Sequence, residues 1–299
     1  MLKHPTLALG LVPSTLAVCF CLLADPAGAQ MMLPGALQAA PPSDAAPATP
    51  GARPGAAGPS KPRTAGQKAP TEAGIVGRDL VREGAAGVMA FQSGAGKSLE
   101  ITRLSFTGAG IANSHEACRV DVVADAPIEL KPAGRAHGLA RYDAAVEACP
   151  FSLEILDGAV LVSKLAAPCD FAQADCRVDP AGLWGPAGDS IDDKQIKVME
   201  RERARAEGAM RTNFRALLSS AGKDKAAIKQ IAADQAGFSS EREVACHNYR
   251  KEEVHGFCAL RLTEARALAL QAEFEARPKD AKGANQRKAP NKTKPKPSP

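Results

Sequence analysis

Apolar residues recur at about every second position in much of the stretch between Leu99 and Lys164. A period of two is typical of a β-strand, whose side chains point alternately to its two faces. Turn residues, namely Gly, Pro, Asp and Asn, separate the runs. The pattern therefore predicts five or six short antiparallel strands, which form a small β domain over residues 96–166. The runs lie at 99–106, 119–123, 128–130, 139–142 and 151–156.

The apolar spacing changes to three and four residues after Trp184, and this spacing predicts helices. Ser190 and Asp193 form a capping-box-like start for a first helix, which Gly222 ends. A second helix is expected over about 224–254 and a third over about 258–277. Residues 167–277 are thus expected to form an antiparallel helical bundle, which makes the fold α+β. The first helix carries the apolar stripe Ile196, Met199, Ala206, Met210, Phe214 and Leu217.

Both ends of the mature chain have a composition unlike that of a folded core. Residues 30–95 are dominated by Ala, Pro and Gly, so they bury too little apolar surface to offset the entropy of ordering. A disordered spacer is expected there, and a disordered basic tail over 278–299. The tail accounts for the formal net charge of +5, and it either grips an anionic envelope component or only keeps the protein in solution.

The first 29 residues have the three parts of a cleaved secretory signal. A short basic region precedes an apolar region over 7–23, and Ala27-Gly28-Ala29 fits the cleavage rule. The mature protein is therefore expected in the periplasm or outside the cell, with no transmembrane segment after cleavage. Lipid attachment at Cys19 is the alternative, although branched Val18 stands where a lipobox has a small residue.

Removal of the signal leaves six cysteines, and an even number in an exported chain indicates disulfides. The simplest pairing joins neighbours along the chain, 118 with 149, 169 with 176 and 246 with 258. A zinc site built from Cys246, His247, His255 and Cys258 is the alternative, and oxidation of both thiols disfavours it. The disulfide cysteines are Cys118, Cys149, Cys169, Cys176, Cys246 and Cys258.

The sequence contains no motif that predicts catalysis. Gly94-Ala95-Gly96-Lys97-Ser98 lacks the first glycine of a phosphate-binding loop, because Phe91 occupies that position. Neither a Gly-x-Ser-x-Gly nor a His-Glu-x-x-His sequence is present. Adjacent carboxylates such as Glu252 and Glu253 are expected on a solvated helix face. We therefore expect that the chain is not an enzyme, uses no cofactor or metal, and binds no nucleic acid.

The second and third predicted helices share a spaced pattern of polar, aromatic and cysteine residues. It reads Gln235-x-x-Phe238-x-x-x-Arg242-x-x-x-Cys246-x-x-Tyr249, then Gly256-x-Cys258, then Leu262-Thr263-x-x-Arg266. With Cys169 and Cys176 upstream, it resembles the LprI-type lysozyme inhibitor family over about residues 169–274. The motif side chains fall on one helical stripe and are expected to contact the partner helix as scaffold. They are Gln235, Phe238, Arg242, Cys246, Tyr249, Cys258, Thr263 and Arg266.

The resemblance implies a periplasmic helical module, and some members of that family block lysozyme. An inhibitor covers the carboxylate-lined cleft of the enzyme, so it needs an exposed rigid loop and no catalytic group. The turns His255-Gly256-Phe257 and Gly182-Leu183-Trp184-Gly185 are two candidates, and we favour the interpretation that both are apolar caps. Lysozyme is the partner that the resemblance implies. The alternative is a non-catalytic binding or structural module of the cell envelope.

Overall fold

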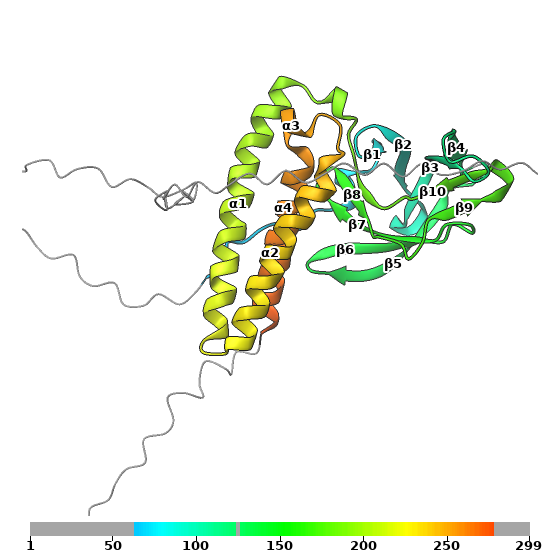
Figure 1. Cartoon of the computed structure of the whole chain (residues 1–299). Coiled ribbons are helices and arrows are strands. Elements are labelled where there is room, and N and C mark those ends of the chain that lie inside the picture. Colours follow the sequence, from blue (N-terminus) through cyan, green and yellow to red (C-terminus); the bar gives the residue numbers. More distant parts are fainter. Residues whose placement is uncertain (1–62, 124–125, 278–299) are drawn as a thin grey trace, which may run out of the picture. The chain divides into compact units, whose positions relative to one another are not determined.

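The computed structural model describes residues 63–123 and 126–277, which form an α+β fold as predicted (Figure 1). A large antiparallel sheet comes first along the chain, and three long helices follow it. The predicted signal peptide, about half of the predicted spacer and the predicted basic tail lie outside the described residues. No helix in the described ranges is long and apolar enough to cross a membrane.

Eleven strands of the described chain form one sheet, and eight of them close a ring. Around the ring the order is β1, β2, β3, β5, β6, β7, β8 and β11, and each strand pairs antiparallel with both neighbours. Closure pairs the strand edges that an open sheet would expose. The strands are β1 Asp79–Arg82, β2 Ala86–Ser93, β3 Leu99–Gly110, β4 Ala117–Asp121, β5 Ile128–Ala136, β6 Leu139–Ala144, β7 Phe151–Leu156, β8 Ala159–Val162, β9 Cys169–Phe171, β10 Cys176–Val178 and β11 Gly182–Gly185.

The long strand β3 takes part in two sets of pairings. Its first half pairs with β2 and β5, and its second half pairs with β4 and β10. Ala109 lies opposite both Ala117 and Arg177, so β4 and β10 flank β3 there. The sheet encloses a core of fully buried apolar side chains, in which the Trp184 indole donates a 2.9 Å hydrogen bond to the Pro180 carbonyl.

The sheet extends on both sides of the predicted range 96–166. β1 and β2 lie inside the predicted spacer, and β9, β10 and β11 lie inside the predicted helical domain. The chain just before the sheet is also held in place. Buried Asn213 accepts a 2.7 Å hydrogen bond from the Ala65 amide and donates one of 2.9 Å to the Ala267 carbonyl. Both predicted boundaries are therefore wrong, because short strands rich in Gly and Ala carry little apolar signal.

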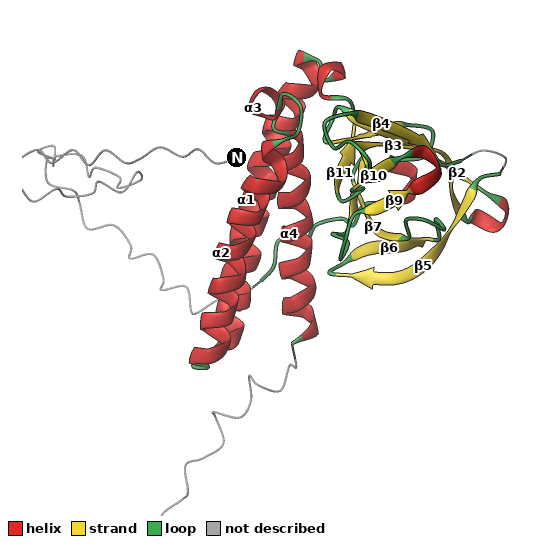
Figure 2. Ribbon diagram, turned by 45° about the vertical axis from the view of Figure 1, so that its right-hand side comes forward, coloured by secondary structure: helices red, strands yellow, loops and turns green. Residues whose placement is uncertain are grey.

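Helices α1, α2 and α4 lie side by side (Figures 1 and 2). α1 begins with a capping box, in which Asp192 accepts from the Gln195 amide at 2.8 Å and Gln195 accepts from the Asp192 amide at 2.9 Å. The predicted pair Ser190 and Asp193 does not form the cap, since the Ser190 hydroxyl donates to the Ala187 carbonyl. The helices are α1 Asp193–Ala221, α2 Lys225–His247, α3 Glu252–His255 and α4 Phe257–Ala276, and the 3₁₀ turns are Glu72–Gly74, Ala95–Lys97, Ala172–Ala174 and Gly188–Ser190.

The second predicted helix is shorter than expected. It ends at His247, and Lys251 adopts a left-handed φ of 58° before the single turn α3 begins. Tyr249 lies in this break, is 2% exposed, and donates a 2.7 Å hydrogen bond to the Pro186 carbonyl. Gly185 has to be glycine, because a Cβ there would lie 2.5 Å from the Phe257 ring and 2.7 Å from the Tyr249 hydroxyl.

One buried apolar cluster contains side chains from the sheet and from the helices. The sheet contributes residues of β6, β7, β8 and β11, and the helical part contributes residues of α1, α2 and α4 with the segments between them. This cluster joins the two parts of the chain through packed apolar surface. Its members include Leu139, Leu156, Ala159, Leu183, Met199, Ala206, Tyr249, Phe257, Leu260 and Leu268.

Candidate functional site

Six cysteines form three disulfides, Cys118–Cys176, Cys149–Cys169 and Cys246–Cys258. The predicted pairing of 246 with 258 is confirmed, and the predicted pairings of 118 with 149 and of 169 with 176 are wrong. Cys118 on β4 and Cys176 on β10 are brought together because both strands flank β3. In the β9–β10 hairpin Cys169 faces Val178 and not Cys176. Three disulfides indicate an oxidising compartment outside the cytoplasm.

The motif residues of α2 and α4 contact one another across the helix interface. Arg242 donates a 2.8 Å hydrogen bond to the Thr263 hydroxyl, and Arg266 donates one of 3.1 Å to Gln235 Oε1. The guanidinium carbons of Arg242 and Arg266 each lie 5.6 Å from the centroid of the Phe238 ring. Hydrogen bonds and cation–π contacts therefore hold these side chains within the structure.

His255 and Glu252 belong to the single turn α3, directly before α4. The His255 Nδ1 atom accepts from the Phe257 amide at 3.1 Å, so the Nε2 atom carries the hydrogen that binds the Arg250 carbonyl at 2.9 Å. Glu252 accepts from the Cys258 and Ala259 amides at 3.0 and 2.8 Å. Among the described residues no group of three or more His, Cys, Asp or Glu is placed to hold a metal ion.

The two turns proposed from the sequence as inhibitory loops are buried. His255 and Phe257 are each 4% exposed, and Leu183 and Trp184 are 3% and 1% exposed. Leu183 and Trp184 belong to strand β11 and not to a turn. Burial on this scale leaves no side chain free to enter the cleft of another protein. Both segments serve packing, which is the interpretation that the sequence favoured.

The loop between β3 and β4 is exposed along its whole length, from Ile111 to Glu116. Asp175 fastens one end, because its carbonyl accepts from the Ile111 amide at 3.1 Å and its carboxylate accepts from the Ala112 amide at 3.0 Å. The Cys118–Cys176 disulfide ties the strand that follows the loop to the same segment. The loop is therefore anchored on both sides to one part of the chain.

Hydrogen bonds inside the loop fix its tip. Asn113 accepts from the His115 amide at 3.2 Å and donates to Glu116 Oε1 at 3.0 Å. The Glu116 amide donates to the Asn113 carbonyl at 3.0 Å. The imidazole of His115 has no hydrogen-bond partner among the described residues, so its ring nitrogens face solvent. In the sequence, residues 111–116 show only a turn signal between two strands, a pattern that does not distinguish this loop from an ordinary turn.

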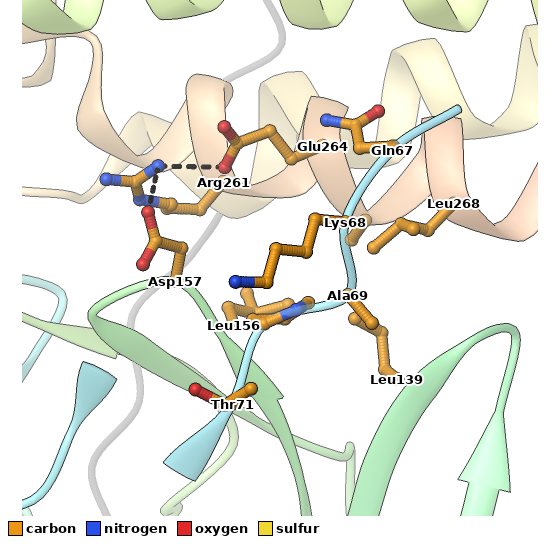
Figure 3. A pocket seen from close by; sticks show the side chains of 12 residues that line it. Gln67, Lys68, Ala69, Thr71, Leu139, Leu156, Asp157, Arg261, Glu264 and Leu268 are labelled. Atoms are coloured by element: carbon orange, nitrogen blue, oxygen red, sulfur yellow. Dashed lines mark hydrogen bonds and ion pairs between the residues drawn. The ribbon is translucent and has the colours of Figure 1, made fainter. Parts of the chain in front are cut away.

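Arg261 lies where the sheet meets the helices, and it is 8% exposed. Its Nη1 atom lies 2.8 Å from Glu264 and 3.4 Å from Asp157 (Figure 3). Glu202 lies 3.8 Å from the same atom. Its guanidinium carbon lies 5.2 Å from the centroid of the Phe257 ring, and its Nε atom is buried without a hydrogen-bond partner. Burial raises the pKa of Glu264 above its usual value, and the charge of Arg261 opposes that rise.

Arg261 lines two cavities. The first, of about 250 Å³, is shown in Figure 3, where the Lys68 side chain extends across it toward Asp157 and Leu156. The second, of about 380 Å³, is formed by β1, the turn after β7, the start of α1 and the start of α4. Cavities at the junction of two structural parts are common ligand sites.

The comparisons with known proteins found nothing similar to this chain. No protein-family model, no curated protein and no solved structure matches it.

Proposed function

We propose that this chain is an extracytoplasmic, non-catalytic binding protein that docks on lysozyme and blocks its cleft. One observation carries the proposal, namely the exposed β3–β4 loop that a disulfide and Asp175 anchor on both sides. In this proposal the three helices act as a bundle, stapled at Cys246–Cys258, which supports the sheet and takes no direct part in docking. Lysozyme is proposed as the binding partner because the motif of α2 and α4 resembles that of lysozyme inhibitors.

The loop has the properties that a cleft-blocking element needs. A loop that is already ordered loses little conformational entropy on binding, which leaves more of the contact energy as affinity. Lysozymes cleave sugar chains with a pair of carboxyl groups on the floor of a cleft. The free imidazole of His115 can donate a hydrogen bond to such a carboxylate, and the partly exposed Ile111 side chain can cover apolar wall.

Lysozyme-driven clearing of a cell-wall suspension tests the proposal, measured with and without the purified mature protein. The expected result is loss of lysis that grows with added protein. Replacing His115 by Asn should weaken inhibition about tenfold, as expected for a central contact residue. His137→Asn is the matched control, because His137 is also an exposed histidine in a hairpin turn and lies between β5 and β6. Full lysis at a tenfold molar excess of protein would sink the proposal.

A different observation supports the envelope-binding alternative. Lys131, Arg141 and Lys164 line an open cavity of about 530 Å³ on the sheet, with Asp143 as the acidic residue among them. A cationic hollow of this kind attracts anionic polymers by electrostatics. Co-sedimentation with purified peptidoglycan in the absence of lysozyme tests this function. Lys131→Gln with Lys164→Gln should abolish co-sedimentation and leave the lysis assay unchanged.

A further inference from the structure

The larger cavity beside Arg261 has an apolar interior. Leu80, Met199 and Phe257 are almost fully buried, and they line the cavity with Ile191 and Val198. Val198 is 42% exposed, which makes it one of the few large apolar side chains of the described residues that face solvent. Exposed apolar surface around a hollow is typical of a binding site rather than of a monomer's ordinary surface.

Positive charge borders the same cavity. Arg78 and Lys194 line it, and among the described residues neither side chain has a hydrogen-bond or ion-pair partner. Two acidic residues also line it, but Asp79 pairs with Arg103 and Glu202 pairs with Arg261. The two cations without partners therefore leave an excess of positive charge beside the apolar wall.

We propose that this cavity binds a single-chain acyl carboxylate. An apolar chain would cover Leu80, Val198 and Phe257, and the carboxylate would pair with Arg78 or Lys194 at the rim. The volume of about 380 Å³ lies near the small end of known ligand pockets, so one chain fits better than the two chains of a membrane lipid. This site is separate from the β3–β4 loop, and the proposal does not depend on lysozyme binding.

Calorimetric titration of the full mature protein with decanoate tests the proposal, with decanol and acetate as comparison ligands. Decanoate should bind more tightly than either, because decanol lacks the charge and acetate lacks the chain. Lys194→Gln should weaken decanoate binding about threefold, the range of one solvent-accessible ion pair. Val198→Asp should weaken it about tenfold or more, since it removes apolar contact and adds a like charge.

Two control variants, one on α1 and one on α2, separate these effects from general changes. Lys197→Gln removes a charge from α1 three residues beyond Lys194, and Val244→Asp alters a 74% exposed valine on α2. Neither residue lines the cavity, and both variants should bind decanoate as the unmodified protein does. Equal affinity for decanol and decanoate would overturn the proposal. So would equal effects of Lys194→Gln and Lys197→Gln, or no heat of binding with decanoate.

Discussion

Arg242 on α2 donates a 2.8 Å hydrogen bond to the hydroxyl of Thr263 on α4, 21 residues away along the chain. Thr263 is fully buried, and its hydroxyl in turn donates to the Ala259 carbonyl at 2.6 Å. The same arginine covers one side of the Phe238 ring. One threonine hydroxyl therefore joins a helix backbone to a charged side chain of the neighbouring helix.

Thr263→Val should lower the free energy of unfolding by about 1–3 kcal/mol, because the substitution keeps the shape and leaves the Arg242 donor unpaired. Urea unfolding followed by circular dichroism measures the change. Thr212→Val on α1 is the matched control. The Thr212 hydroxyl also bonds a carbonyl four residues earlier, that of Gly208, but the residue is exposed and has no partner on another helix. Equal losses in the two variants would contradict the role given to Arg242.

The disulfide pairing predicts a specific peptide map. Trypsin separates Cys118 in peptide 104–119 from Cys149 in peptide 142–164, and it leaves Cys169 and Cys176 together in peptide 165–177. The pairings Cys118–Cys176 and Cys149–Cys169 should link all three peptides into one species under non-reducing conditions.

Nearest-neighbour pairing would instead link the first two peptides and leave 165–177 alone with an internal bridge. A second digest before aspartate separates Cys169 from Cys176, because Asp170 and Asp175 lie between them. It should yield a fragment pair that joins Cys118 to Cys176. Mass spectrometry of both digests decides between the pairings, and a free thiol in either digest would contradict the pattern of three bridges.

Local sequence patterns were sufficient to predict those parts of the fold that depend on residues close together in the chain. Strand β7 alternates between buried and half-buried side chains from Phe151 to Ile155, and the turn at Gly222 ends α1 where the sequence predicted. The Cys246–Cys258 bridge spans only 12 residues between two helices. For each of these features the physical cause lies within one or two turns of chain, so periodicity and spacing reveal it.

Features that depend on contacts between residues far apart in the chain could not be predicted from the local sequence pattern. Strand β2 contains Gly87 at a φ of 64°, where a Cβ would lie 2.5 Å from the Ser105 carbonyl and 3.2 Å from the Trp184 ring. This strand needs small residues because the backbone at Gly87 lies close to Ser105 and Trp184. The same small residues give the segment the composition of a disordered spacer, which is why the sequence predicted one there. The anchoring of the β3–β4 loop depends on Asp175, about 60 residues beyond it.

The two tyrosines of the chain should ionise only at strongly alkaline pH in the folded protein. Burial, helped by the hydrogen bond and charge of Glu72, raises the pKa of Tyr142 to about 12. Burial also raises the pKa of Tyr249 above its usual value, and the charge of Glu252 adds to the rise. Because the folded state holds both protons more tightly, stability should fall as pH rises above about 10.

Phenolate absorbance measures this effect. In the folded protein it should stay low at pH 10 and 11, whereas in concentrated urea both groups should titrate near pH 10. Tyr249→Phe removes the hydrogen bond to the Pro186 carbonyl and leaves Tyr142 as the single tyrosine. Its folded state should then show one titration near pH 12. A folded protein in which either tyrosine titrates at about pH 10 would contradict the burial of Tyr249 or the partly buried position of Tyr142 beside Glu72.

Glu264 links the buried Arg261 site to the pH dependence of stability. Burial raises the pKa of the Glu264 carboxyl above its usual value of 4.5, and the charge and hydrogen bond of Arg261 oppose the rise without cancelling it. The folded state therefore binds the proton more tightly than the unfolded state does. The contribution of this group to stability is present in full below pH 4.5 and is lost as pH rises through the folded-state pKa.

Glu264→Gln should remove that dependence. Between neutral pH and about pH 5, the unmodified protein should gain free energy of unfolding relative to the variant, because protonation of Glu264 favours the folded state. Urea unfolding at the two pH values gives the difference, from which groups common to both proteins cancel. Glu273→Gln is the control, since Glu273 also pairs with an arginine of the same helical region, Arg277, but is about half exposed. The difference in free energy of unfolding between Glu273→Gln and the unmodified protein should change less with pH than the difference for Glu264→Gln does. If instead the Glu264→Gln protein gained stability relative to the unmodified protein on acidification, Glu264 would be held as a carboxylate by Arg261, and burial would not dominate at this junction.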